Sequence, residues 1–216
     1  MVKAVMFDMD GTLLDTERLS VESWKQVNDR LGISLTDEVV ESFIGRTREA
    51  VIDIIAGVVG DHDEAERIYA LHRDIENQIA EHDLQLKPGA REALDALRDA
   101  GVSVGLATSS RLETARRNFT RFGLMDRFST VTCGEDVTHG KPDPEMYLLA
   151  AQRAGVSPAE CAAVEDSPNG VRSAHAAGMH TFMVPDRIAP TPEIETLCDG
   201  VLESLFDLVP AFERLG

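Results

Sequence analysis

Two aspartates near the N-terminus, Asp8 and Asp10, directly follow the apolar run 2–7. Side chains alternate across a strand, so residues two apart point to the same side. Two carboxylates held together inside a protein are costly unless a cation or a proton compensates them. Gly11 then allows the chain to turn sharply out of the strand. This pattern favours a metal-bound aspartate nucleophile with a second aspartate beside it as acid and base.

Polar residues of the same kind follow apolar segments farther along the chain. They are Thr108 and Ser109 after 102–107, Glu165 and Asp166 after 161–164, and Lys141 in a loop before a helical stretch. Carboxylate and hydroxyl oxygens suit a hard cation, Mg²⁺ above all, and the scattered histidines do not indicate zinc. Lysine and threonine can hold phosphoryl oxygens. Asp8 could then attack phosphorus, while Asp10 protonates the leaving oxygen and later deprotonates water.

Alternating strands and helices are expected to position these residues. Strands are expected at 2–7, 102–107, 130–133, 161–164 and 181–184, and helices at 90–100, 112–122, 145–154, 167–177 and 202–214. This alternation predicts an α/β fold with a doubly wound, Rossmann-like parallel sheet. Ligands of such sheets bind outside the carboxyl ends of the strands, so the polar residues should meet in one crevice.

The segment 16–86 differs from the rest because its pattern is helical throughout. Helices are expected at 16–31, 36–43, 49–59 and 63–81. In the first of them, Trp24 belongs to an apolar stripe that indicates core packing rather than a substrate platform, and Gly32 should end the helix. We therefore predict a catalytic core of residues 1–15 and 87–216, interrupted by an all-helical domain at 16–86.

The charge of the chain limits its partners. A net charge of −17 argues against binding to nucleic acid or to an anionic membrane surface. No apolar run reaches the ~18 residues of a membrane span, and the chain start lacks the pattern of a signal peptide. The three cysteines have no CxxC spacing and are interpreted as reduced, mostly buried thiols. We expect a cytoplasmic monomer.

Four motifs together resemble those of the haloacid dehalogenase superfamily. They are DMDGT around Asp8, Thr108 after the second strand, Lys141 in KPDP, and VEDSPNG around Asp166. The resemblance extends over essentially the whole chain, insertion included. The subgroup that the chain is similar to contains the β-phosphoglucomutase-like sugar-phosphate phosphatases and mutases.

The resemblance implies a role for each matching residue. Asp8 is the nucleophile, and Asp10 is the acid and base, with a backbone carbonyl that also binds Mg²⁺. The other roles are Asp166 as a metal ligand, Glu165 as a metal ligand directly or through water, and Thr108, Ser109 and Lys141 as the residues that bind the transferring phosphate.

The resemblance also identifies the insertion as a cap domain that closes over the site, excludes water and selects the substrate. The turn 45–48 resembles the specificity loop of such caps, and Arg48 is expected to hold a second anionic group of the substrate. Thr16 is expected to face the crevice, and Trp24 would face it too if it served as a substrate platform.

One cap position departs from the mutases of the subgroup. They carry a histidine where this chain has Ser20, and the difference favours water over a sugar hydroxyl as the phosphoryl acceptor. A cap lysine of the mutases has no clear counterpart, although His72 or Arg73 could fill its space.

We therefore expect a Mg²⁺-dependent phosphatase of small phosphorylated metabolites, with sugar phosphates as the expected class, that forms an aspartyl phosphate on Asp8. The alternative is a β-phosphoglucomutase-like mutase using the same intermediate, and a third hypothesis is a non-catalytic binding protein. Simpler interpretations treat Asp8 and Asp10 as turn residues, Glu165 and Asp166 as the acidic start of a helix, Lys141 as a solvated loop charge and Arg48 as an ordinary helix-face charge.

Overall fold

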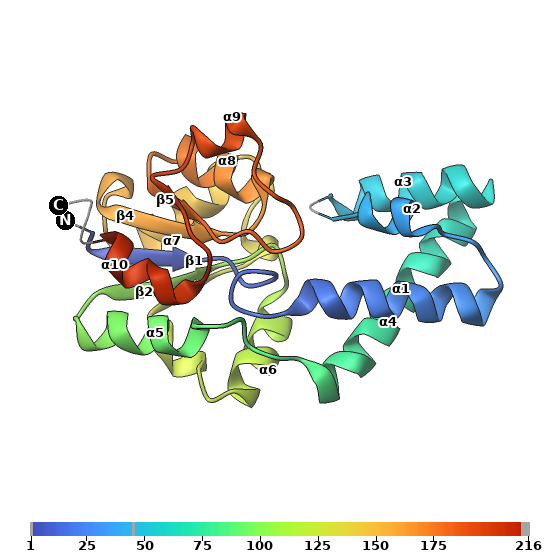
Figure 1. Ribbon diagram of the computed structural model, residues 1–216, viewed down its shortest axis with the longest axis horizontal. Coiled ribbons are helices and arrows are strands. Elements are labelled where there is room, and N and C mark those ends of the chain that lie inside the picture. Colours follow the sequence, from blue (N-terminus) through green and yellow to red (C-terminus); the bar gives the residue numbers. More distant parts are fainter. Residues whose placement is uncertain (1, 45, 213–216) are drawn as a thin grey trace. The chain divides into compact units, whose positions relative to one another are not determined.

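The chain forms two compact units in the computed structural model, which describes residues 2–44 and 46–212 (Figure 1). One unit contains Met1–Leu14 and Leu86–Gly216, and the other contains Asp15–Gln85. The predicted boundaries differ from these by one residue at each junction. Among the described residues, no helix has the length and apolar character needed to cross a membrane.

The first unit is built around a six-stranded parallel sheet with the strand order β3-β2-β1-β4-β5-β6. The strands are β1 (Ala4–Phe7), β2 (Ser103–Ala107), β3 (Thr130–Thr132), β4 (Cys161–Glu165), β5 (His180–Met183) and β6 (Gly200–Val201). Strand β1 is wholly buried at the centre, where Phe7 lies opposite Leu106 and Val164. The predicted doubly wound sheet is confirmed.

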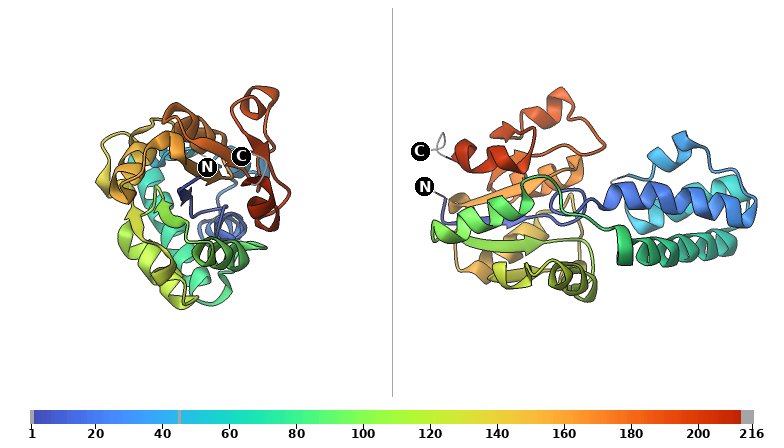
Figure 2. Two further views of the ribbon diagram at one scale, coloured as in Figure 1. Left: turned by 90° about the vertical axis from the view of Figure 1, so that its left-hand side faces the viewer. Right: turned by 60° about the horizontal axis from the view of Figure 1, so that its bottom comes forward.

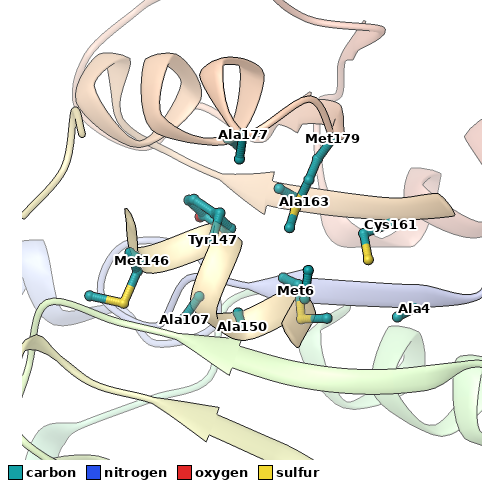
Figure 3. Close-up of a cluster of buried hydrophobic side chains, with 12 residues drawn as sticks. Ala4, Met6, Ala107, Met146, Tyr147, Ala150, Cys161, Ala163, Ala177 and Met179 are labelled. Carbon is teal, nitrogen blue, oxygen red and sulfur yellow. The ribbon is translucent and has the colours of Figure 1, made fainter. Parts of the chain in front are cut away.

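Helices cover both faces of this sheet (Figures 1 and 2). They are α5 (Ala90–Asp99), α6 (Leu112–Arg121), α7 (Glu145–Ala154), α8 (Pro168–Ala176), α9 (Pro192–Glu195) and α10 (Leu208–Phe212). One face is covered by α7 and α8, whose side chains, among them Tyr147 and Ala174, form an apolar cluster with Met6 and Ala163 (Figure 3). Helices α5 and α10 contact each other on the opposite face.

The helix predicted at 202–214 is wrong in its extent. The described part of this segment contains a 3₁₀ turn at Leu205–Asp207 and then α10, and residues 213 and 214 lie outside the described chain. The Asp207 carboxylate accepts from the Ser204 backbone N–H and hydroxyl, at 3.1 and 2.9 Å. This capping starts a new turn after Ser204, so the described part of the segment is not one continuous helix.

The helical unit contains α1 (Thr16–Leu31), α2 (Asp37–Glu41), α3 (Arg48–Val59) and α4 (His62–Asp83). Helix α4 packs against both α1 and α3. Helix α1 ends where predicted, at Gly32, whose φ of 65° is favourable for glycine. Trp24 is 2% exposed in the core of this unit, which confirms that it packs there.

The two linker segments that join the units form hydrogen bonds with each other. In the sheet unit, Leu14 forms an antiparallel bridge with Leu86, and the Lys87 N–H donates to the Leu13 carbonyl at 2.9 Å. In the helical unit, the Asp15 N–H donates to the Gln85 carbonyl at 3.0 Å. The outgoing and returning segments therefore run side by side.

Candidate active site

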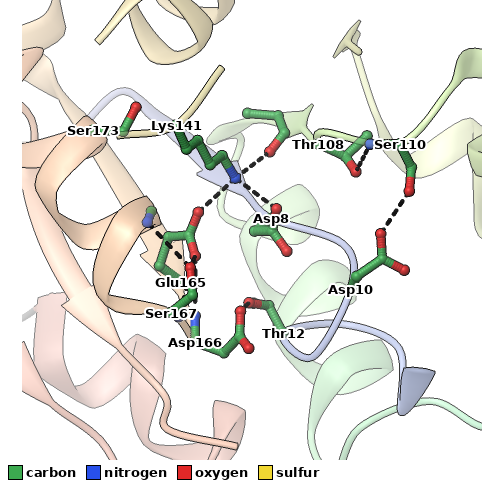
Figure 4. Close-up of polar contacts among 12 residues, drawn as sticks. Asp8, Asp10, Thr12, Thr108, Ser110, Lys141, Glu165, Asp166, Ser167 and Ser173 are labelled. Carbon is green, nitrogen blue, oxygen red and sulfur yellow. Dashed lines mark hydrogen bonds and ion pairs between the residues drawn. The ribbon is translucent and has the colours of Figure 1, made fainter. Parts of the chain in front are cut away.

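The predicted polar residues of the sheet unit meet at the carboxyl edge of the sheet (Figure 4). Asp8 follows β1, and its N–H continues the ladder to the Val164 carbonyl at 3.0 Å. Thr108 follows β2, and Glu165 is the last residue of β4. They converge because neighbouring parallel strands end at the same edge.

Lys141 lies between two carboxylates at the centre of the site. Its Nζ atom is 2.6 Å from Asp8 Oδ1 and 2.6 Å from Glu165 Oε1, and it donates to the Ala107 carbonyl at 3.0 Å. The side chain is only 8% exposed, so it is not a solvated loop charge. Although burial opposes the charge, the carboxylates of Asp8 and Glu165 raise the pKa of Lys141, which therefore stays a cation.

Asp8 carries a buried negative charge that Lys141 only partly compensates. Burial raises the pKa of Asp8 to about 8 against the attraction of Lys141, and the negative charges of Glu165 and Asp10 add to the rise. The attraction of Lys141 therefore offsets only part of the cost of burying this charge. A further cation beside Asp8 would favour the ionised, nucleophilic form.

The geometry of the carboxylates fits a hard cation. Asp8, Glu165 and Asp166 each place an oxygen within 4.8 Å of the other two, and all three residues are buried. Thr12 orients one of them, since its hydroxyl donates to Asp166 Oδ1 at 3.1 Å. Gly11 makes this approach possible, because its φ is +80° and a Cβ atom there would lie 2.2 Å from Asp166 Oδ2. Such a set of oxygen ligands suits Mg²⁺.

Asp10 is not one of these three grouped carboxylates, and it has a hydrogen-bond partner of its own. The Ser110 hydroxyl donates to Asp10 Oδ2 at 2.7 Å, and the Ser110 N–H donates to Thr108 Oγ1 at 3.0 Å. The two aspartates of the first motif therefore have different partners, Lys141 for Asp8 and Ser110 for Asp10. The separate roles of nucleophile and acid–base group that the sequence predicts for Asp8 and Asp10 remain predictions.

Glu165 is fully buried and has protein donors at both carboxylate oxygens. Oε1 accepts from Lys141 and, at 2.7 Å, from the hydroxyl of Tyr147. Oε2 accepts from the Asp166 N–H at 3.2 Å and from the Ser167 hydroxyl at 3.2 Å. Ser167 also caps α8, as the alternative reading of this segment predicts, by accepting from the Gly170 N–H at 3.1 Å. Capping of α8 and a carboxylate cluster thus coexist.

The remaining predicted residues are divided between the two units. Ser109 is exposed next to Thr108. Thr16 and Arg48 belong to the helical unit, where Arg48 is exposed, forms an ion pair with Glu66 and lies 5.6 Å from the ring centre of Tyr69. Their roles toward a substrate remain predictions.

The Ser20 position contains a hydrogen-bonded pair within the helical unit. The Ser20 hydroxyl lies 3.3 Å from His72 Nε2, and the His72 ring stacks on Trp24 with 3.9 Å between ring centres. Burial and then the charge of Arg73 lower the pKa of His72 to about 3, so the ring is neutral. His72 therefore does not supply the positive charge of the mutases' cap lysine.

Sequence reasoning assigned no role to three residues of the site, Thr12, Ser110 and Tyr147. Thr12 lies within the DMDGT motif and Ser110 lies two residues after Thr108, so both positions could have indicated a place in the site. Tyr147 lies six residues after Lys141 on an apolar helix face, where a tyrosine is expected to pack in the core. Its contact with Glu165 depends on the tertiary structure.

Comparison with known proteins identifies the family of the chain. A family model described as haloacid dehalogenase-like hydrolase matches residues 2–178. Hexitol phosphatase B of Escherichia coli is 33% identical, covering 100% of this chain and 97% of its own, and β-phosphoglucomutase of Bacillus subtilis is 32% identical, covering 82% and 81%. The structure of CbbY from Rhodobacter sphaeroides in complex with phosphate covers 96% of both chains at 25% identity, with a TM-score of 0.76. The chain belongs to the haloacid dehalogenase-like hydrolases.

Proposed function

We propose that the protein is a Mg²⁺-dependent phosphatase of small phosphorylated metabolites, with sugar phosphates as the principal class. One observation carries the proposal: a buried aspartate, Asp8, is held by Lys141 while a second, Asp10, is held apart by Ser110. The phosphatase relative, similar along its whole length, supports this reaction class.

In the proposed reaction, a carboxylate oxygen of Asp8 attacks the phosphorus, and the ester P–O bond breaks with its electron pair passing to the leaving oxygen. Asp10 gives that oxygen a proton. Water then gives a proton to Asp10 and attacks the aspartyl phosphate, which releases inorganic phosphate and restores Asp8. Ser110 donates to Asp10 Oδ2, so Oδ1 is the oxygen that can carry the proton.

The charges around Asp8 support the cofactor assignment. Asp8 and Asp166 would hold Mg²⁺, joined by the Asp10 carbonyl that the family resemblance implies, and Glu165 would contribute directly or through water. When bound, Mg²⁺ supplies positive charge that offsets the carboxylates and the phosphoryl oxygens. Lys141 places its ammonium group on Asp8, where it would also neutralise an arriving phosphoryl group.

The test is a phosphate-release screen over phosphorylated metabolites with Mg²⁺, with β-glucose 1-phosphate included. We expect free phosphate from several sugar phosphates. Formation of glucose 6-phosphate without free phosphate would instead indicate a mutase, the activity of the β-phosphoglucomutase relative.

An Asp8→Asn variant tests the covalent mechanism. We expect a loss of roughly three orders of magnitude or more in turnover, as for removal of other enzymatic nucleophiles. The matched control is Asp136→Asn, which removes a carboxylate held by Arg153 at 2.7 and 2.9 Å elsewhere in the sheet unit. The control should lose stability and keep its activity. Full phosphate release by Asp8→Asn would refute the aspartyl phosphate.

A further inference from the structure

The Tyr147 side chain carries a hydroxyl group that its packing in the core does not require. Its ring is fully buried in the apolar cluster between α7 and the sheet, where a phenylalanine ring would fill the same space (Figure 3). A buried hydroxyl is costly unless it forms a hydrogen bond. Its bond to Glu165 Oε1, at 2.7 Å, satisfies that requirement and connects the core to the site.

The same Glu165 oxygen also accepts from Lys141, which in turn binds Asp8. Lys141 is therefore shared between two carboxylates at equal distances of 2.6 Å. A donor on Glu165 Oε1 compensates part of the charge of that oxygen and weakens its attraction for Lys141. Without that donor, the ammonium group would move toward Glu165 and away from Asp8.

We propose that Tyr147 is a positioning residue that controls how Lys141 is shared between Glu165 and Asp8. The hydroxyl acts through Glu165 and leaves the lysine charge available at the nucleophile and at an incoming phosphoryl group. This inference rests on the proposed function, because the role of Lys141 in phosphoryl transfer is itself part of that proposal.

The first test is Tyr147→Phe, which deletes only the hydroxyl. We expect kcat/KM to fall about tenfold, the size of one hydrogen bond to a charged group. The matched control is Thr181→Val, which deletes a buried hydroxyl that donates to the Met179 carbonyl at 3.2 Å in the same unit. The control should lose stability without changing kcat/KM. Equal kcat/KM values for folded wild type and Tyr147→Phe would overturn the proposal.

A double-mutant cycle with Glu165→Gln distinguishes positioning from a general loss of packing. If Tyr147 acts through Glu165, the loss of kcat/KM in the double variant equals that of Glu165→Gln alone. Fold-losses that multiply would mean that the hydroxyl acts by another route, and the proposal would be wrong.

Affinity for inorganic phosphate in the presence of Mg²⁺, measured by calorimetry, decides the inference without turnover. We expect several-fold weaker binding for Tyr147→Phe and unchanged binding for Thr181→Val. If wild type binds phosphate but hydrolyses no substrate, the proposed function fails while this comparison still tests Tyr147. If wild type does neither, both proposals are overturned.

Discussion

Replacing a glycine inside a helix with alanine usually stabilises a protein. At Gly170 in α8 the same substitution should be destabilising, because Glu165 packs closely against this residue. A Cβ atom on Gly170 would lie 1.9 Å from Glu165 Cδ and 2.0 and 2.1 Å from its two oxygens. An ordinary contact needs 3.4 Å or more, so the carboxylate would have to move by more than an ångström. That displacement breaks the hydrogen bonds that hold Glu165 to Lys141 and Tyr147.

The magnitude follows from two opposing contributions. Alanine inside a helix is favoured over glycine by about 0.5–1 kcal/mol. Against this, disrupting a buried, hydrogen-bonded ion pair costs about 3–5 kcal/mol. The Gly170→Ala variant should therefore be less stable by about 2–4.5 kcal/mol and should lose most of its phosphatase activity.

The chain offers a matched control in Gly57, another helical glycine, at which a Cβ atom would meet nothing within 4 Å. Urea unfolding followed by far-UV circular dichroism should show Gly57→Ala to be more stable by about 0.5–1 kcal/mol, opposite in sign to Gly170→Ala. If both alanine variants gained stability, the close contact between Glu165 and α8 would be refuted.

Three further predictions concern other parts of the molecule. Burial lowers the pKa of His72 from 6.5 to about 3, so between these two pH values the unfolded ring binds a proton more readily than the folded one. The helical unit should therefore lose roughly 2–3 kcal/mol of stability as the pH falls from 7 to 4.5, which fluorescence of Trp24, the single tryptophan, should detect. A His72→Phe variant showing the same pH dependence would exclude this origin. Thr12→Val removes the donor to Asp166 and should weaken Mg²⁺ binding about tenfold by calorimetry, and unchanged affinity would show that this bond does not orient the ligand. Arg48→Ala should raise KM only for substrates with a second anionic group, and an unchanged specificity constant for every substrate would rule out the role predicted for Arg48.

The sheet and most of the site could be predicted because both depend on local patterns. Apolar runs ending in polar residues predicted the strands that precede Asp8, Thr108 and Asp166, and parallel pairing then brings those ends together. Lys141 could be placed from its motif, although it lies far from Asp8 in the sequence. The predicted Trp24 packing likewise followed from the 3.6-residue period of α1.

The contacts that distribute charge around Lys141 could not be predicted from the sequence. The bond between Tyr147 and Glu165 joins a helix face to a strand end, and no local period indicates that a core tyrosine will donate to a carboxylate. The helix predicted near the C-terminus is too long, because the Asp207 side chain accepts hydrogen bonds from Ser204. Such side-chain bonds to the backbone offer an alternative to a continuous helix. In both cases the outcome depends on which polar partner a side chain finds after folding.

The paired linkers have a consequence for how this protein could change over evolutionary time. Because the segments around Leu14 and Leu86 bridge each other, the sheet unit closes the insertion at its base, whatever its length. Loop-closure entropy rises only with the logarithm of loop length, so each doubling of an insertion adds about 0.6 kcal/mol. Hydrogen bonding between Asp15 and Gln85 likewise joins the ends of the helical unit. An insertion built this way can be lengthened or exchanged with little cost to the sheet, which separates the evolution of its residues from that of the Asp8 chemistry.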